Sequence, residues 1–146
     1  MDGVTTSRVD LTAEECRRLL AGTRRGHLAF TRDALPAMAP VRYALDGDRV
    51  VIPAGSDSEH RLPGRGAVVA LGVDDLDAED DSGWAVTVVG PARSVTDAAG
   101  LAACSALGWP RAPSGEGRCY LVLQTTVIRG WRSVAAPPVP DGWPPA

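Results

Sequence analysis

The sequence predicts a mainly β protein, a six-stranded antiparallel barrel with short flanking helices. Three observations lead to this fold class. Several short stretches alternate between two faces with the period of two that is typical of strands. Glycine, proline and aspartate separate these stretches at short intervals, which favours antiparallel neighbours. Helical spacing together with a capping residue occurs in only two segments. The length of 146 residues fits one domain.

The stretch from Leu35 to Pro53 has the clearest pattern and predicts a hairpin. Asp46-Gly47 tolerates the positive φ of a tight turn, so residues 50–52 are expected to return beside the first strand. Pro40 lacks a ladder donor, which places its strand at an edge, at a bulge, or where the backbone meets a ligand. One face of the strand carries Ala37, Ala39, Val41, Tyr43 and Leu45, and the other carries Met38, Pro40, Arg42 and Ala44.

Two short helices are expected to flank the strands. Thr12 and Glu15 have the spacing of a capping box, which begins a helix over residues 11–20. Thr96-Asp97 can cap a second helix that runs to Leu107.

The other strands follow in chain order. In the first of them, Leu28 and Phe30 share one face and His27 lies on the other. The continuous apolar run over residues 67–73 predicts a strand covered on both sides. Gly90-Pro91 is expected to bend the longest strand. These strands are expected over residues 26–31, 67–73, 84–95, 119–124 and 127–132.

The predicted barrel domain spans residues 11–133. Residues 1–10 show no periodicity and are expected to form a flexible arm. Residues 134–146 are expected to form a tail, because five prolines in residues 137–146 prevent their joining a packed sheet.

Charge and hydropathy exclude several classes of function. The net charge is −3 without a basic stripe, so nucleic acid is not an expected partner. The apolar runs are too short to cross a bilayer, and the N-terminus lacks a signal-peptide pattern, so we expect no membrane and a cytoplasmic location. The sequence contains no lysine, which excludes an internal Schiff base.

No metal site is expected. The three cysteines, Cys16, Cys104 and Cys119, lack zinc-ligand spacing and are an odd number, so we expect free, buried thiols. Six acids crowd residues 74–81, but the glycine and closing glutamate of a calcium loop are missing, which favours a solvated connection. No nucleophile and base pair is evident, so the catalytic residues are unassigned.

A succession of short motifs follows the first helix. They are Gly26-His27-Leu28-Ala29-Phe30-Thr31, Leu35-Pro36-Ala37, Pro40-Val41-Arg42-Tyr43-Ala44-Leu45-Asp46-Gly47, Val73-Asp74-Asp75-Leu76-Asp77, Ser82-Gly83-Trp84-Ala85-Val86, Gly90-Pro91-Ala92 and Ile128-Arg129-Gly130-Trp131-Arg132. In this order the chain resembles the pyridoxamine 5′-phosphate oxidase-like, FMN-binding split-barrel family.

The resemblance implies a six-stranded split barrel that forms a homodimer with two flavin sites at the interface. It implies a flavin-dependent oxidoreductase that acts on a small molecule and binds FMN, with a deazaflavin as another option. In such proteins, the backbone of the Pro40 strand lines the flavin ring, and the segment after the third strand holds the phosphate. The cofactor-binding residues implied are Pro40, Val41, Arg42, Tyr43, Ser56, Arg61, Trp84, Trp131 and Arg132.

The chain departs from the family pattern at the phosphate anchor. An arginine followed by serine or threonine is usual where Pro53-Ala54 stands, with a lysine a few residues on. Arg61 or Arg65 could substitute, and Ser56 or Ser58 could donate. An alternative function is therefore a flavin-free split barrel whose vacated pocket binds, and cyclises or rearranges, an apolar small molecule as a cofactor-independent cyclase or isomerase. A non-catalytic binding protein is a third option.

Several residues keep more than one interpretation. His27 is more often a packed, hydrogen-bonded side chain than a general base. Arg42 fits a site role or a surface ion pair. Trp84 and Trp131 fit a stacking floor for a flat ligand, dimer-interface anchors, or core packing.

Overall fold

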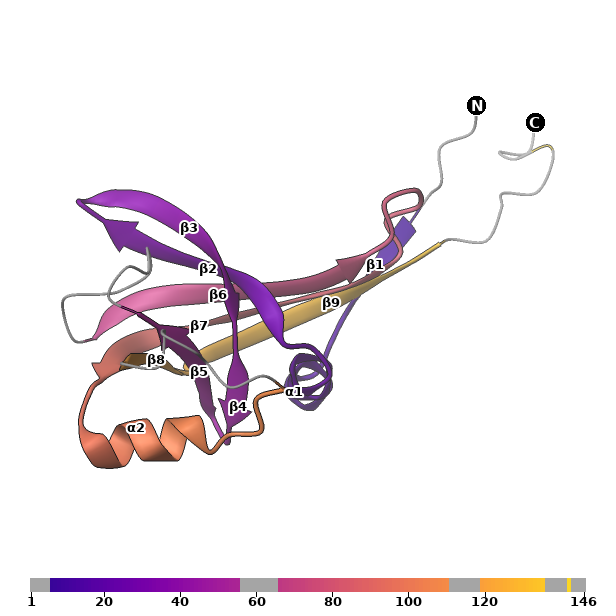
Figure 1. Cartoon of the computed structure of the whole chain (residues 1–146). Coiled ribbons are helices and arrows are strands. Elements are labelled where there is room, and N and C mark those ends of the chain that lie inside the picture. Colours follow the sequence, from indigo (N-terminus) through magenta and orange to yellow (C-terminus); the bar gives the residue numbers. More distant parts are fainter. Residues whose placement is uncertain (1–5, 56–65, 111–118, 136–141, 143–146) are drawn as a thin grey trace.

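The computed structural model describes residues 6–55, 66–110, 119–135 and 142, and its strands form one antiparallel, unclosed sheet (Figure 1). The mainly β antiparallel class is confirmed, with nine strands in place of six. The strands are β1 (Thr6–Asp10), β2 (Arg25–Arg32), β3 (Leu35–Arg42), β4 (Ala44–Asp46), β5 (Arg49–Ala54), β6 (Ala67–Leu76), β7 (Gly83–Val95), β8 (Cys119–Gln124) and β9 (Val127–Ala135). The helices are α1 (Ala13–Ala21) and α2 (Ala98–Ser105).

Strand β7 organises the sheet because it changes partner along one of its edges. Its other edge pairs with β6 throughout residues 83–92. On the changing edge, residues 83–89 pair with β9 and residues 92–95 pair with β8. Gly90 lies at the change, where a Cβ would collide with the Gln124 carbonyl. A side chain is therefore excluded at the point where the sheet splits.

The alternation predicted for the first strand of the hairpin is correct, but the predicted pairing of the two strands is wrong. Ala39, Val41 and Tyr43 are buried while Met38 and Pro40 are exposed, as alternation predicts. β3 is an edge strand of the sheet, as Pro40 indicates. β5, however, pairs with β4 and β8 rather than with β3. The strand breaks at Tyr43, so only the three residues of β4 form the hairpin with β5.

Both helices begin at the predicted caps. The Thr12 hydroxyl accepts from the Glu15 N–H at 3.2 Å, and Asp97 accepts from the Gly100 N–H at 2.9 Å. α1 turns Cys16 and Leu20 into the core. α2 packs against a smaller apolar cluster. Figure 1 shows this helix below the sheet.

Two apolar clusters hold the fold together. The main cluster fills the concave side of the sheet above α1, and the second lies between the β5–β8 pair and α2. All three cysteines are buried and free of disulfides, as expected. The main cluster includes Leu28, Phe30, Val41, Ile52, Leu71, Trp84, Val86, Val88, Leu121 and Leu123.

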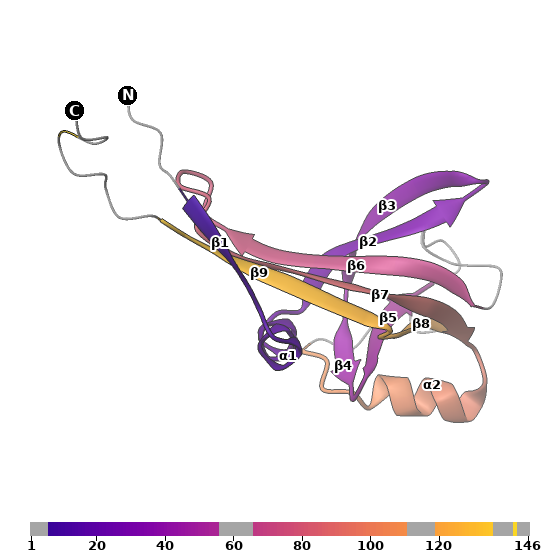
Figure 2. The ribbon, with the colours of Figure 1, turned by 180° about the vertical axis from the view of Figure 1, so that it is seen from behind.

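Three expectations about the chain need correction. Residues 6–10 form β1, paired with β9, and not a loose arm (Figure 2). Residues 134 and 135 continue β9 and do not belong to a tail. β6 is not covered on both sides, because the Val68 side chain is 65% exposed. Within the described part of the chain, no helix is long and apolar enough to span a membrane.

Candidate functional site

The face of the sheet that points away from the main cluster, called here the outer face, carries mainly small side chains on its middle strands β6 and β7. Its members follow from strand register and alternation. One row across β3, β2, β6, β7 and β9 is Met38, Ala29, Ala70, Val89 and Val127, and the next row is Pro40, His27, Gly72, Thr87 and Arg129. Small side chains leave a low, flat surface on which a planar molecule can lie.

A hollow of about 530 Å³ opens on the outer face where β7, β9 and β1 lie side by side. This outer hollow is lined by Asp10, Ala85, Thr87, Val89, Val127, Arg129, Gly130 and Trp131. Its floor is uncharged and its rim carries charges of both signs. Such a combination suits a flat, largely apolar ligand that has a polar end.

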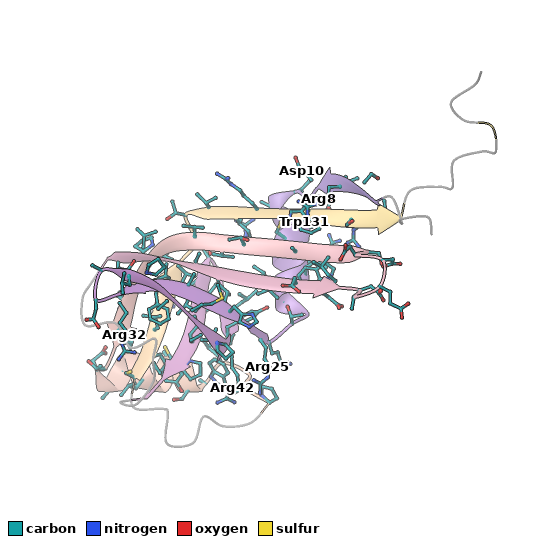
Figure 3. All side chains as sticks on the ribbon, turned by 90° about the horizontal axis from the view of Figure 1, so that it is seen from above. Arg8, Asp10, Arg25, Arg32, Arg42 and Trp131 are labelled. Atoms are coloured by element: carbon teal, nitrogen blue, oxygen red, sulfur yellow. The ribbon has the colours of Figure 1, made fainter. Side chains whose placement is uncertain are left out.

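Trp131 forms a wall of the outer hollow and is held by Arg8. The Arg8 guanidinium carbon lies 3.9 Å from the centre of the Trp131 ring. Figure 3 shows Arg8, Asp10 and Trp131 together on β1 and β9. A cation over an indole face stabilises the ring in one orientation.

The predicted residues of β3 and its continuation divide between two faces. Pro40 and Arg42 lie on the outer face. Val41 and Tyr43 are buried in the main cluster. The Tyr43 hydroxyl donates to the Leu20 carbonyl at 2.7 Å, and burial raises its pKa. Tyr43 therefore fastens β4 to α1, and only its backbone could meet a ligand on the outer face.

The remaining predicted residues also separate. Trp84 is 9% exposed and packs in the main cluster, the core alternative of the three considered. Arg132, opposite Trp84 in the strand register, is exposed on that same face. Trp131 alone among them lines the outer hollow. Ser56 and Arg61 lie outside the described residues.

His27 lies exposed on the outer face, so its predicted orientation away from the core is confirmed. Arg25, directly opposite Arg42 on β2, shares this face. Figure 3 shows these two arginines together, far from Trp131. Three strands, β2, β6 and β7, lie between the ends of the row, and four inter-strand steps of about 4.8 Å put β3 roughly 19 Å from β9. One chain therefore does not bring Arg42 and Trp131 to the same small ligand.

Sequence analysis missed Arg8, Asp10 and Arg129 as site residues. The N-terminal ten residues carry too short a pattern to reveal a strand, and β1 exists because β9 offers it a free edge. Arg129 stands two positions before Trp131, so alternation could have placed both on one face. In the described part of the chain, no group of acids, histidines and cysteines could hold a metal ion.

A second hollow of about 250 Å³ lies at the C-terminal end of α1. It is lined by Leu20, Ala21, Thr23, Arg24, Tyr43, Ala44, Leu45, Leu107, Gly108 and Trp109. Arg24 crosses it by donating to the Gly108 carbonyl at 3.2 Å. Its polar groups bind one another, which leaves the outer hollow as the stronger candidate.

Comparison with known proteins identifies the class. The model of the pyridoxamine 5′-phosphate oxidase family matches residues 12–128, and the chain belongs to this family. The uncharacterised protein Rv0080 of Mycobacterium tuberculosis is 38% identical over 94 residues, which are 61% of this chain. The match covers 62% of that relative's length.

Solved structures agree with the fold. An FAD-binding protein of Mycobacterium smegmatis has a TM-score of 0.67 at 25% identity, over 86% of this chain and 99% of that one. An FAD- and haem-binding protein of the same organism has a TM-score of 0.71 at 21% identity, over 93% of this chain and 77% of that one. The split-barrel resemblance drawn from the motifs is thus confirmed.

Proposed function

We propose that this protein binds a flavin on the outer face of its sheet and is a flavin-dependent oxidoreductase acting on a small molecule. The outer hollow carries the proposal, because it joins a floor of small side chains to an indole wall. A flavin ring is planar and stacks on aromatic side chains. Membership of the family and the likeness to an FAD-binding protein support a flavin as the ligand.

A second copy of this chain completes the site in this proposal. Met38 and Val68 are 66% and 65% exposed on the outer face, and exposed apolar side chains of this kind favour association. If two outer faces meet about a twofold axis, Trp131 of one copy can approach Pro40 and Arg42 of the other. These residues lie roughly 19 Å apart within one chain, which is four strand spacings. In the dimer, residues from two different copies could contact the same ligand in spite of that distance.

The flavin would supply the electron chemistry, and the protein would supply position and charge. The outer face offers arginine side chains and His27 as hydrogen-bond donors. These groups can orient a substrate over the ring without forming a bond to it. The three buried cysteines form no disulfide, which fits a reducing compartment, and a cytoplasmic location is therefore part of the proposal.

The visible spectrum of the purified protein tests the proposal. A yellow protein, or saturable binding of added FMN, FAD or a deazaflavin, is expected, and the three titrations decide which flavin is preferred. Trp131→Ala should weaken binding about tenfold, since base stacking on an aromatic ring contributes about 1 to 3 kcal/mol. Trp109→Ala is the matched control, because Trp109 packs on Tyr120 away from the outer hollow. A colourless protein that takes up no flavin at saturation contradicts the proposal.

Pro53 favours a second candidate function. It is buried within β5 opposite Tyr120, where it offers neither a charge nor an N–H to a phosphate. A flavin-free protein could use the outer hollow to bind and rearrange an apolar molecule by shape alone. This candidate would be supported by a colourless protein that binds an apolar dye and loses that binding in the Trp131→Ala variant. Flavin bound in stoichiometric amount would exclude it.

A further inference from the structure

Arg8 lies beside the outer hollow, because β1 is part of the sheet and Arg8 stacks on Trp131, which lines the hollow. The antiparallel register sets Asp10 opposite Trp131 and Arg8 opposite Ser133. Alternation along β1 then puts Arg8 and Asp10 on the same face as Trp131. Figure 3 shows the three side chains side by side. A segment outside the stretch that matches the family model thus contributes to the site.

The donors of Arg8 are available to a ligand. A guanidinium that stacks on an indole uses its flat face, and its five N–H groups point outward in its plane. Among the residues that the structure describes, the ring contact with Trp131 is the only side-chain interaction recorded for Arg8. The N–H groups therefore lie at the rim of the outer hollow without a protein acceptor in that part of the chain.

Charges of both signs surround the outer hollow, and a cation is the one that contacts the indole. β9 contributes Arg129, and β1 contributes Arg8 and Asp10. β7 contributes only the uncharged Ala85, Thr87 and Val89. Asp74 of β6, opposite Ala85 in the strand register, is exposed on the same face, so the two carboxylates equal the two arginines in number. Arg8 is the cation in direct contact with the indole on which a flat ring would stack.

The chain lacks a cationic anchor at the end of β5. The sequence contains no lysine, and Pro53 stands at the end of β5. A phosphate binds best to fixed, charge-assisted donors, and the planar fork of arginine binds two of its oxygens at once.

Resting on the flavin function proposed above, we infer that Arg8 binds the phosphate of the flavin. β1 then acts as the strand that selects phosphorylated flavins over riboflavin. Trp131 contributes to the binding of both kinds of flavin, because both carry the ring.

Binding of FMN and of riboflavin to four proteins tests this inference. The proteins are the unchanged chain, Arg8→Gln, Arg8→Lys and the control Arg17→Gln, whose side chain is exposed on α1. Glutamine keeps a planar group on the indole and removes the charge. Arg8→Gln should weaken FMN binding about tenfold or more, as loss of a charge-assisted contact does, and change riboflavin binding by no more than about twofold. Arg8→Lys should keep part of the FMN affinity that Arg8→Gln loses. The control Arg17→Gln should bind FMN and riboflavin as tightly as the unchanged chain does.

The outcomes separate this inference from the proposed function. Equal weakening of FMN and riboflavin would show that Arg8 only positions Trp131, and unchanged FMN binding would show that it has no role. Either result overturns the inference and leaves the flavin function standing. If the unchanged chain binds none of FMN, FAD, riboflavin and a deazaflavin, the proposed function fails and the inference fails with it. Thermal unfolding of each variant shows that a lost affinity does not come from lost folding.

Discussion

At the scale of single residues, the turn between β2 and β3 contains an avoidable strain. Asp33 and Ala34 have φ of 52° and 63°, values that an alanine side chain disfavours. Glycine adopts them without that penalty.

Ala34→Gly should therefore stabilise the fold by about 1 kcal/mol, the cost of one left-handed alanine. The midpoint of urea unfolding measures it. Ala37→Gly is the control, because Ala37 lies in β3 without a positive φ and packs against the main cluster. The control should lose stability, and an equal response of both variants would contradict the explanation.

A second residue links stability to pH. Burial, followed by the neighbouring Glu15 carboxylate, raises the pKa of the Cys16 thiol. The folded chain thus holds this proton more tightly than the unfolded chain, whose thiol titrates near its ordinary value of about 8.5. The contribution to stability is complete below that pH and is lost as the pH rises through the folded pKa.

Urea midpoints at pH 7, 8, 9 and 10 should show this loss on the alkaline side. Cys16→Ala removes the titrating thiol, so its midpoint should fall less between pH 8 and pH 10. A variant whose midpoint falls as steeply as that of the unchanged chain would assign the alkaline loss to other groups. The buried Cys104 thiol, whose pKa burial also raises, is the first of these.

At the scale of elements, α1 lies against β9 at a glycine. A Cβ on Gly130 would meet the Cys16 sulfur at 2.7 Å, the Ala85 carbonyl at 3.0 Å and a Val86 methyl at 3.1 Å. Close packing leaves no room for that methyl group without movement of the helix.

Gly130→Ala should destabilise the fold by about 1 to 3 kcal/mol, as overpacking does. Adding Cys16→Ala removes the sulfur and should recover part of the loss, because the Ala85 and Val86 contacts remain. A double-mutant cycle on the unfolding free energies measures the coupling. Strict additivity would show that α1 and β9 do not meet at this point.

The elements also show how far local sequence determines the structure. Helix caps at Thr12 and Asp97 and the alternation of β3 are local, and each was predictable. The pairing of β5 depends on β8, which lies some 70 residues away in sequence. The two faces of β7 are both apolar, with Trp84 on one and Ala85 on the other. Alternation alone therefore could not decide which tryptophan packs in the core and which lines the site.

At the scale of the whole molecule, substitutions of two side chains near the β2–β3 turn can distinguish an effect on dimer formation from an effect on folding. Met38 and Leu35 are 66% and 67% exposed, and they lie on opposite faces of β3. Only Met38 belongs to the outer face that we propose to be the dimer interface.

Met38→Arg should convert the dimer to a monomer and lower flavin content, with little change in the stability of the monomer. Leu35→Arg is matched in exposure and should leave the dimer intact. Sedimentation equilibrium measures both. The proposed interface would be contradicted if both variants were monomeric or if both remained dimeric. A monomeric unchanged chain would also contradict it.

The edge position of β3 has a further consequence for the fate of the protein at high concentration. Pro36 and Pro40 both keep register with β2, so their nitrogens point away from the ladder, toward the open edge. An edge without those two N–H groups is a poor template for a strand from another chain. The protein can therefore expose an apolar sheet face for association while its β3 edge resists pairing with a strand of another chain.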